Sequence, residues 1–205
     1  MNILDVFQKG LVLDSSQHPY DTTKRYAYVE HPTEGWRVYL RSAVFLHPTN
    51  ESFDPTHFLV VKKTGKDSWE PPKGRMEGKD IHGRSVLQLL KENATREVGE
   101  EAHIEKIQSL THTGLVFQSQ EQNYPENHYF QYHIFQGFVA PKQLKESEET
   151  FEWIHEHPKG FARWKKDRRE KDDIAWFHPR ETRLNPRWAP DLVSLYIRKN
   201  LKNRV

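Results

Sequence analysis

One amphipathic helix between two pairs of β-rich runs is the feature that most constrains this fold. Five apolar residues recur at spacings of three or four: Leu87, Leu90, Ala94, Val98 and Ala102. That spacing puts them on one face of a helix and predicts a helix over 86–102. Ser85, with Gln88 three residues later, has the form of a capping box at its start.

Four runs rich in β-branched and aromatic residues flank the helix and predict strands. They span 36–46, 58–62, 104–118 and 128–139. The first two should pair, because the polar segment between them has turn chemistry. Residues 69–74 (Trp-Glu-Pro-Pro-Lys-Gly) predict a rigid irregular loop, since paired prolines fix φ and remove two donors. The middle of the chain is therefore expected to run β-β-loop-α-β-β.

The two ends are expected to extend this unit. Residues 1–31 are interpreted as an N-terminal arm packed on or flanking a single domain over 32–205, with one strand near 25–29. A strand over 174–177 and a closing helix over 190–201 follow, the helix burying Val193, Ile197 and Leu201. Between them lies a long charged insertion at about 144–171.

Composition excludes several classes. The chain has no Cys, which rules out disulfides, a thiolate nucleophile and Cys-ligated zinc. It has no apolar run long enough for a membrane span and no visible leader, so we expect an intracellular protein, cytoplasmic or nuclear, with no membrane partner. The formal net charge is only +2, so a polyanion would have to meet a local patch.

Three acids define the candidate chemistry. Glu97, Glu100 and Glu101 stand at i, i+3 and i+4, which places their carboxylates side by side on one helical face. Such a cluster is either a solvated face or a site for hard divalent cations such as Mg²⁺ or Mn²⁺. His155 and His157 lack a third ligand, so the sequence disfavours zinc there.

The loop and helix together resemble the Nudix box, G-x5-E-x7-R-E-U-x-E-E-x-G-U, in which U is aliphatic. The matching residues are Gly74, Asp80, Arg96, Glu97, Val98, Glu100, Glu101 and Ile104. Asp80 replaces Glu, His103 replaces Gly, and eight extra residues separate Asp80 from Arg96. The resemblance implies an α/β fold, a Nudix-type α/β/α sandwich with a mixed β-sheet.

It also implies a metal-dependent pyrophosphohydrolase that cleaves a phosphoanhydride bond of a nucleoside diphosphate-linked substrate by water attack on phosphorus. Glu97, Glu100, Glu101 and the Lys73 backbone carbonyl would hold Mg²⁺ or Mn²⁺, with Arg96 in the catalytic set. An acid at the Asp80 position would help Arg96 to fix the loop to the helix. A further acid from a later loop is expected. The candidates are Glu146, Glu148, Glu149, Glu152 and Asp173, with Glu149 or Glu152 as the first guesses.

Substrate contacts are expected from two basic groups. Lys73 and Arg75 flank Gly74 and can reach phosphate. The segment 159–171 interleaves basic residues with Phe161 and Trp164, so its cations could bind RNA or could form a solvated surface. The cations predicted to bind substrate there are Lys165, Lys166, Arg168 and Arg169.

The favoured substrates are a dinucleoside polyphosphate or 5′-capped RNA, with a diphosphoinositol polyphosphate also considered. The alternative is a Nudix-fold module that binds RNA or nucleotide without cleaving it.

Overall fold

The structure is a computed structural model that describes residues 2–18 and 21–202. Its elements follow the chain in this order: β1 (Val12–His18), β2 (Asp21–Glu30), β3 (Arg37–Pro48), β4 (Leu59–Lys63), β5 (Trp69–Glu70), β6 (Lys73–Arg75), α1 (Val86–Glu101), β7 (Ser109–Ser119), β8 (His128–Val139), α2 (Pro141–Glu156), α3 (Pro158–Phe161), the 3₁₀ helix η1 (Lys166–Arg169), β9 (Lys171–Trp176) and α4 (Ala189–Lys202).

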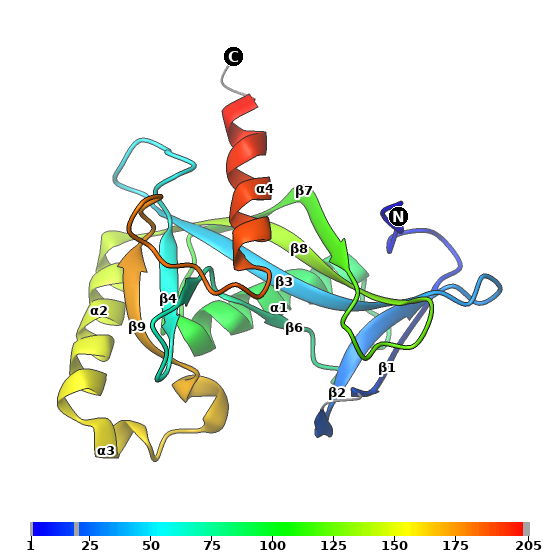
Figure 1. The fold of residues 1–205 in the computed structure, drawn as a ribbon, viewed down its shortest axis with the longest axis horizontal. Coiled ribbons are helices and arrows are strands. Elements are labelled where there is room, and N and C mark those ends of the chain that lie inside the picture. Colours follow the sequence, from blue (N-terminus) through cyan, green and yellow to red (C-terminus); the bar gives the residue numbers. More distant parts are fainter. Residues whose placement is uncertain (1, 19–20, 203–205) are drawn as a thin grey trace.

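A mixed six-stranded sheet forms the centre of the molecule (Figure 1). Its strand order is β1-β2-β3-β8-β7, with β6 also paired to β3. Strands β3 and β8 run parallel from Arg37 opposite His128 to Pro48 opposite Val139, and the other pairs are antiparallel. A second, antiparallel sheet has the order β5-β4-β9. The predicted α/β class with a mixed sheet is confirmed.

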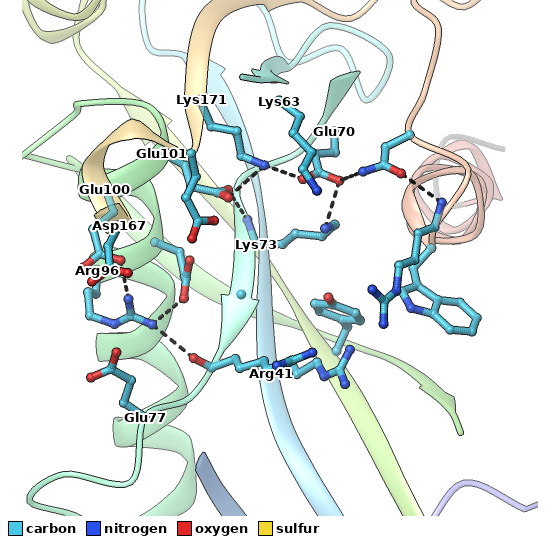
Figure 2. A pocket seen from close by; sticks show the side chains of 18 of the residues that line it. Arg41, Lys63, Glu70, Lys73, Glu77, Arg96, Glu100, Glu101, Asp167 and Lys171 are labelled. Atoms are coloured by element: carbon cyan, nitrogen blue, oxygen red, sulfur yellow. Dashed lines mark hydrogen bonds and ion pairs between the residues drawn. The ribbon is translucent and has the colours of Figure 1, made fainter. Parts of the chain in front are cut away.

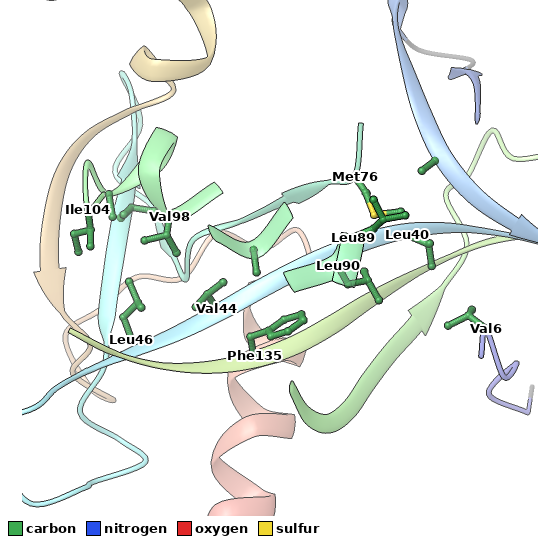
Figure 3. Close-up of a cluster of buried hydrophobic side chains, with 14 of the residues drawn as sticks. Val6, Leu40, Val44, Leu46, Met76, Leu89, Leu90, Val98, Ile104 and Phe135 are labelled. Carbon is green, nitrogen blue, oxygen red and sulfur yellow. The ribbon is translucent and has the colours of Figure 1, made fainter. Parts of the chain in front are cut away.

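The two central strands bury both of their faces. On β3, Val38, Leu40, Val44 and Leu46 join one core cluster, while Tyr39, Ala43 and Phe45 join another. This alternation follows the two-residue period of a strand. Helix α1 packs on the first cluster through Leu90, Ala94 and Val98 (Figure 3). Helix α4 packs on the second through Leu192, Val193 and Tyr196, so the architecture has three layers.

Helix α1 lies where the sequence predicts it. Ser85 caps it, because the Ser85 hydroxyl accepts a hydrogen bond of 3.2 Å from the Gln88 N–H. The predicted apolar stripe is wrong at one residue. Leu87 was expected to be buried but is 45% exposed, and Leu89 is buried instead. In α4 the same error occurs at Leu201, which is 48% exposed at the penultimate position of the helix.

The strand pairing predicted for 36–46 and 58–62 is also wrong. Strand β3 has no free edge for β4, because β2 and β6 occupy one edge and β8 the other. Strand β4 instead pairs with β5 and β9. The loop predicted over 69–74 contains two short strands, since only Pro71 and Pro72 lack donors and the residues on either side can pair.

The terminal segments are more ordered than the sequence indicates. The expected arm contributes the β1–β2 hairpin to the edge of the main sheet. The charged insertion carries most of α2, all of α3 and η1, and the first residue of β9. None of the helices in the described part of the chain is long and apolar enough to span a membrane.

Leu90→Ala tests the packing of α1 on the sheet. Leu90 is fully buried in the first core cluster, so its truncation should lower the free energy of unfolding by about 2–5 kcal/mol. Leu87→Ala on the same helix is the matched control and should change it by less than about 1 kcal/mol. Urea denaturation measures both. Equal losses in the two variants would contradict the packing described.

Candidate functional site

A cavity of about 290 Å³ opens beside β6 and the C-terminal half of α1. Fifteen of its twenty lining residues carry a formal charge. The acids are Glu70, Glu77, Glu97, Glu100, Glu101, Asp167 and Glu170. The cations are Lys24, Arg41, Lys63, Lys73, Arg75, Arg96, Lys171 and Arg187. Such a cavity suits a ligand that is itself highly charged.

Gly74 lets the backbone of β6 lie directly against the α1 carboxylates. A Cβ on Gly74 would fall 2.1 Å from Glu97 Oε1, so no larger residue fits without moving that side chain. Two hydrogen bonds hold the approach. The Lys73 N–H donates to Glu101 Oε2 at 2.9 Å, and Asn93 Nδ2 donates to the Gly74 carbonyl at 3.3 Å.

Arg96 ties the same strand to the same helix. Its guanidinium donates to the Arg75 carbonyl at 3.1 Å and to Asn93 Oδ1 at 2.8 Å. It also forms ion pairs with Glu97 and Glu100. Asp80 takes no part in this arrangement, since it is exposed and its backbone carbonyl faces Arg84. Arg96 therefore anchors the loop through a backbone carbonyl.

A buried network of alternating charges extends from Glu101 away from the helix (Figure 2). Lys171 Nζ lies 2.9 Å from Glu101 Oε1 and also pairs with Glu70. Glu70 Oε2 accepts from Lys73 Nζ at 2.9 Å and from Asn185 Nδ2 at 2.8 Å. The side chains of Lys171, Glu70 and Glu101 are 3–4% exposed. Each buried charge thus has a partner, as burial requires.

Burial and pairing move the carboxyl pKa values in opposite directions. Burial raises the pKa of Glu97 to about 8; Arg96 opposes the rise, while Glu101 and Glu100 add to it. Burial alone would also raise the pKa of Glu70, yet Lys73 and Lys171 lower it to about 2. Glu70 is therefore ionised near neutral pH, whereas the charged form of Glu97 is stabilised less well by its surroundings.

The donor chemistry at α1 fits a hard divalent cation. Glu97, Glu100 and Glu101 supply carboxylate oxygens, the ligand type that Mg²⁺ and Mn²⁺ prefer. Burial raises the pKa of Glu97, and the neighbouring Glu101 and Glu100 add to the rise; a bound cation would favour the ionised carboxylate instead. Within residues 2–18 and 21–202, however, no three His, Asp or Glu side chains are already grouped as a metal site. Arg96 and Lys171 hold these carboxylates instead.

The structure brings together only part of the predicted site. Lys73 and Arg75 line the cavity with the acids of α1. The predicted cations of the insertion do not line it: Lys165, Lys166, Arg168 and Arg169 are exposed. Arg168 faces Glu105 at 3.4 Å, and Arg169 donates to the Ala162 carbonyl at 2.8 Å.

Three residues of that segment line the cavity although the sequence did not predict them as site residues: Asp167, Glu170 and Lys171. Asp167 comes from η1, and its carboxylate lies 2.9 Å from Lys24 Nζ. Lys171 is the first residue of β9. The periodicity of a helix or strand in the sequence cannot predict their position in the cavity, because that position depends on how the insertion folds back over the sheet. Glu149 and Glu152 lie exposed on α2, away from the cavity lining.

No family model matches the sequence, and no curated protein sequence matches it. Among solved structures, a NUDIX hydrolase from Nitrosomonas europaea is 16% identical, with a TM-score of 0.45 over 78% of this chain and 89% of that chain. A mutT/nudix family protein from Listeria innocua is 19% identical, with a TM-score of 0.43 over 81% and 94%. A C. elegans Ap4A hydrolase is 15% identical, with a TM-score of 0.41 over 80% and 98%. Likenesses at these identities and TM-scores assign neither an activity nor a substrate to this chain.

Gly74→Ala tests the contact between β6 and α1. The added Cβ would collide with the Glu97 carboxylate, so we expect the free energy of unfolding to fall by about 1–3 kcal/mol. Gly99→Ala, also in α1, is the matched control. The nearest atom to a Cβ at Gly99 would be the Ile104 carbonyl oxygen at 3.9 Å, which is an ordinary contact. It should stabilise the helix by roughly 0.5–1 kcal/mol. Urea denaturation distinguishes them, and a neutral Gly74→Ala would refute the close contact.

Proposed function

We propose that this chain is a Nudix-type pyrophosphohydrolase that depends on Mg²⁺ or Mn²⁺. It would cleave a phosphoanhydride bond in a nucleoside diphosphate-linked substrate by attack of water on phosphorus. The observation that carries the proposal is the packing of Gly74 against Glu97, with Glu100 and Glu101 beside it in one charged cavity. Those residues are also the ones that match the Nudix box.

Each part of the cavity has a task in this reaction. Glu97, Glu100 and Glu101, with the Lys73 carbonyl, would hold the divalent cations. Bound there, the cations would neutralise phosphate charge and acidify the attacking water. Arg96 positions Glu97 and Glu100 while it fixes the β6 backbone. As the alternative to a ligand role, Glu97 would accept a proton from the attacking water.

Asp167 is the strongest candidate for the additional acid. It lines the cavity, and its charge contributes to raising the pKa of Glu100, which burial raises first. Lys24 holds it at 2.9 Å and pairs equally with Glu77. Glu149 and Glu152 are on the exposed face of α2 and cannot serve from there.

The favoured substrates remain a dinucleoside polyphosphate and 5′-capped RNA, with a diphosphoinositol polyphosphate as a further candidate. RNA would use Lys165, Lys166, Arg168 and Arg169, whose exposure outside the cavity suits a chain that continues past the cleaved group. An intracellular location, cytoplasmic or nuclear, stays a prediction. The alternative, a module that binds nucleotide without cleaving it, lacks a specific observation in its favour because Glu97, Glu100 and Glu101 are all present.

Hydrolysis of a substrate panel with Mg²⁺ or Mn²⁺ tests the proposal. The panel contains diadenosine tetraphosphate, capped RNA, ADP-ribose and a diphosphoinositol pentakisphosphate. We expect turnover of at least one member, its loss on chelation, and a fall of at least about 100-fold in kcat for Glu100→Gln, because that change removes a charged ligand. Ion-exchange chromatography of the products measures the rates.

Two further variants locate the additional acid. Asp167→Asn should lower kcat at least about tenfold if that carboxylate serves the reaction. Glu149→Gln, the same change on the exposed face of α2, should leave kcat within about twofold of the wild type. A folded protein that cleaves no member of the panel, yet binds one of them, would establish the binding-module alternative.

A further inference from the structure

Three arginines line the side of the cavity away from the acids of α1, and two of them share one carboxylate. Arg41, Arg75 and Arg187 all line the cavity. Arg41 pairs with Glu121 Oε1 at 3.0 Å, and Arg187 pairs with Glu121 Oε2 at 2.8 Å. Both oxygens of Glu121 are thereby occupied. In Figure 2 the Arg41 side chain lies apart from Glu100 and Asp167.

Arg75 brings the excess positive charge. It stands directly opposite Arg41 in the antiparallel pairing of β6 with β3, so the two side chains leave the sheet on the same face. Its guanidinium lies 5.2 Å above the ring of Tyr26. Within the part of the chain that the structure describes, Arg75 forms no ion pair with a carboxylate. We call Arg41, Arg75, Arg187 and Glu121 the arginine wall of the cavity. Its three guanidinium groups and one carboxylate sum to a net charge of +2.

Like charges on directly opposed strand positions destabilise a sheet unless another charge relieves them. Within the arginine wall, Arg41 is held in place by its surroundings. Arg41 is 2% exposed, its guanidinium lies 3.8 Å above the ring of Phe130, and one of its nitrogens donates to the Tyr124 hydroxyl at 3.0 Å. A planar guanidinium held rigidly, with a second one across the strand pair, is suited to bind phosphate oxygens at two points.

We propose that Arg41, Arg75 and Arg187 form an anion subsite for a phosphate group of the substrate that lies outside the cleaved linkage. This inference rests on the proposed function, which places the cleaved phosphoanhydride at the acids of α1. A ligand that fills both ends must carry at least one phosphate beyond the two that flank that bond. The subsite therefore selects substrates with three or more linked phosphates over simple diphosphates.

Calorimetry with sodium tripolyphosphate tests the subsite directly, with EDTA present so that no divalent cation takes part. The wild type should bind. Arg75→Gln and Arg187→Gln should each weaken binding about tenfold or more, since each removes a charge-assisted contact. Arg180→Gln is the matched control, because Arg180 is exposed and lies outside the cavity lining; it should bind within about twofold of the wild type.

Absence of binding by the wild type, or Arg75→Gln binding as tightly as the wild type, would overturn the subsite. A second measurement separates it from the proposed function. In Arg75→Gln, the KM for diadenosine tetraphosphate should rise about tenfold more than the KM for ADP-ribose. Equal rises would contradict selection for long polyphosphates. If no member of the substrate panel is cleaved, the proposed function fails, and the calorimetry still decides the subsite.

Discussion

The close approach of the β6 backbone to the carboxylates of α1 is the contact on which the rest of the site depends. A residue larger than glycine at position 74 would displace the Glu97 carboxylate from its place, and the Lys73 N–H beside it reaches Glu101 at 2.9 Å. Because β6 also pairs with β3, the acids of the helix are positioned relative to the central sheet. Any loss of that contact would move the charged groups on both sides of the cavity together.

Burying so many charges in one cavity is stable only because they are arranged in alternation. Glu70 lies between Lys73 and Lys171, and Glu101 lies between Lys171 and the Lys73 N–H. An ion removed from water costs several kcal/mol unless its partner and its hydrogen bonds are in place. The insertion contributes directly to this balance, because β9 delivers Lys171 and η1 delivers Asp167 to the same cavity. It is thus part of the site, in addition to forming an exposed surface.

The periodicity of the sequence predicted the features that depend only on residues close in the chain, such as the faces and the ends of helices. The spacing of Glu97, Glu100 and Glu101 identified their shared face, and Ser85 identified the start of α1. Residues that meet only through the tertiary fold were missed, as Lys171 and Asp167 show. The parallel pairing of β3 with β8 joins strands about ninety residues apart, so the turn chemistry next to β3 pointed to the wrong partner. Leu87 was misassigned because the buried face of α1 is shifted toward Leu89.

The central claim is that the α1 carboxylates form a site for a divalent cation. Electron paramagnetic resonance of Mn²⁺ tests it without any substrate, since binding removes the signal of the free ion. The account predicts that the wild type binds Mn²⁺ and that the double variant Glu97→Gln with Glu100→Gln binds at least about tenfold more weakly. The double variant Glu148→Gln with Glu149→Gln on α2 should match the wild type. An unchanged free-ion signal with the wild type, or equal affinity in the α1 variant, would contradict the claim.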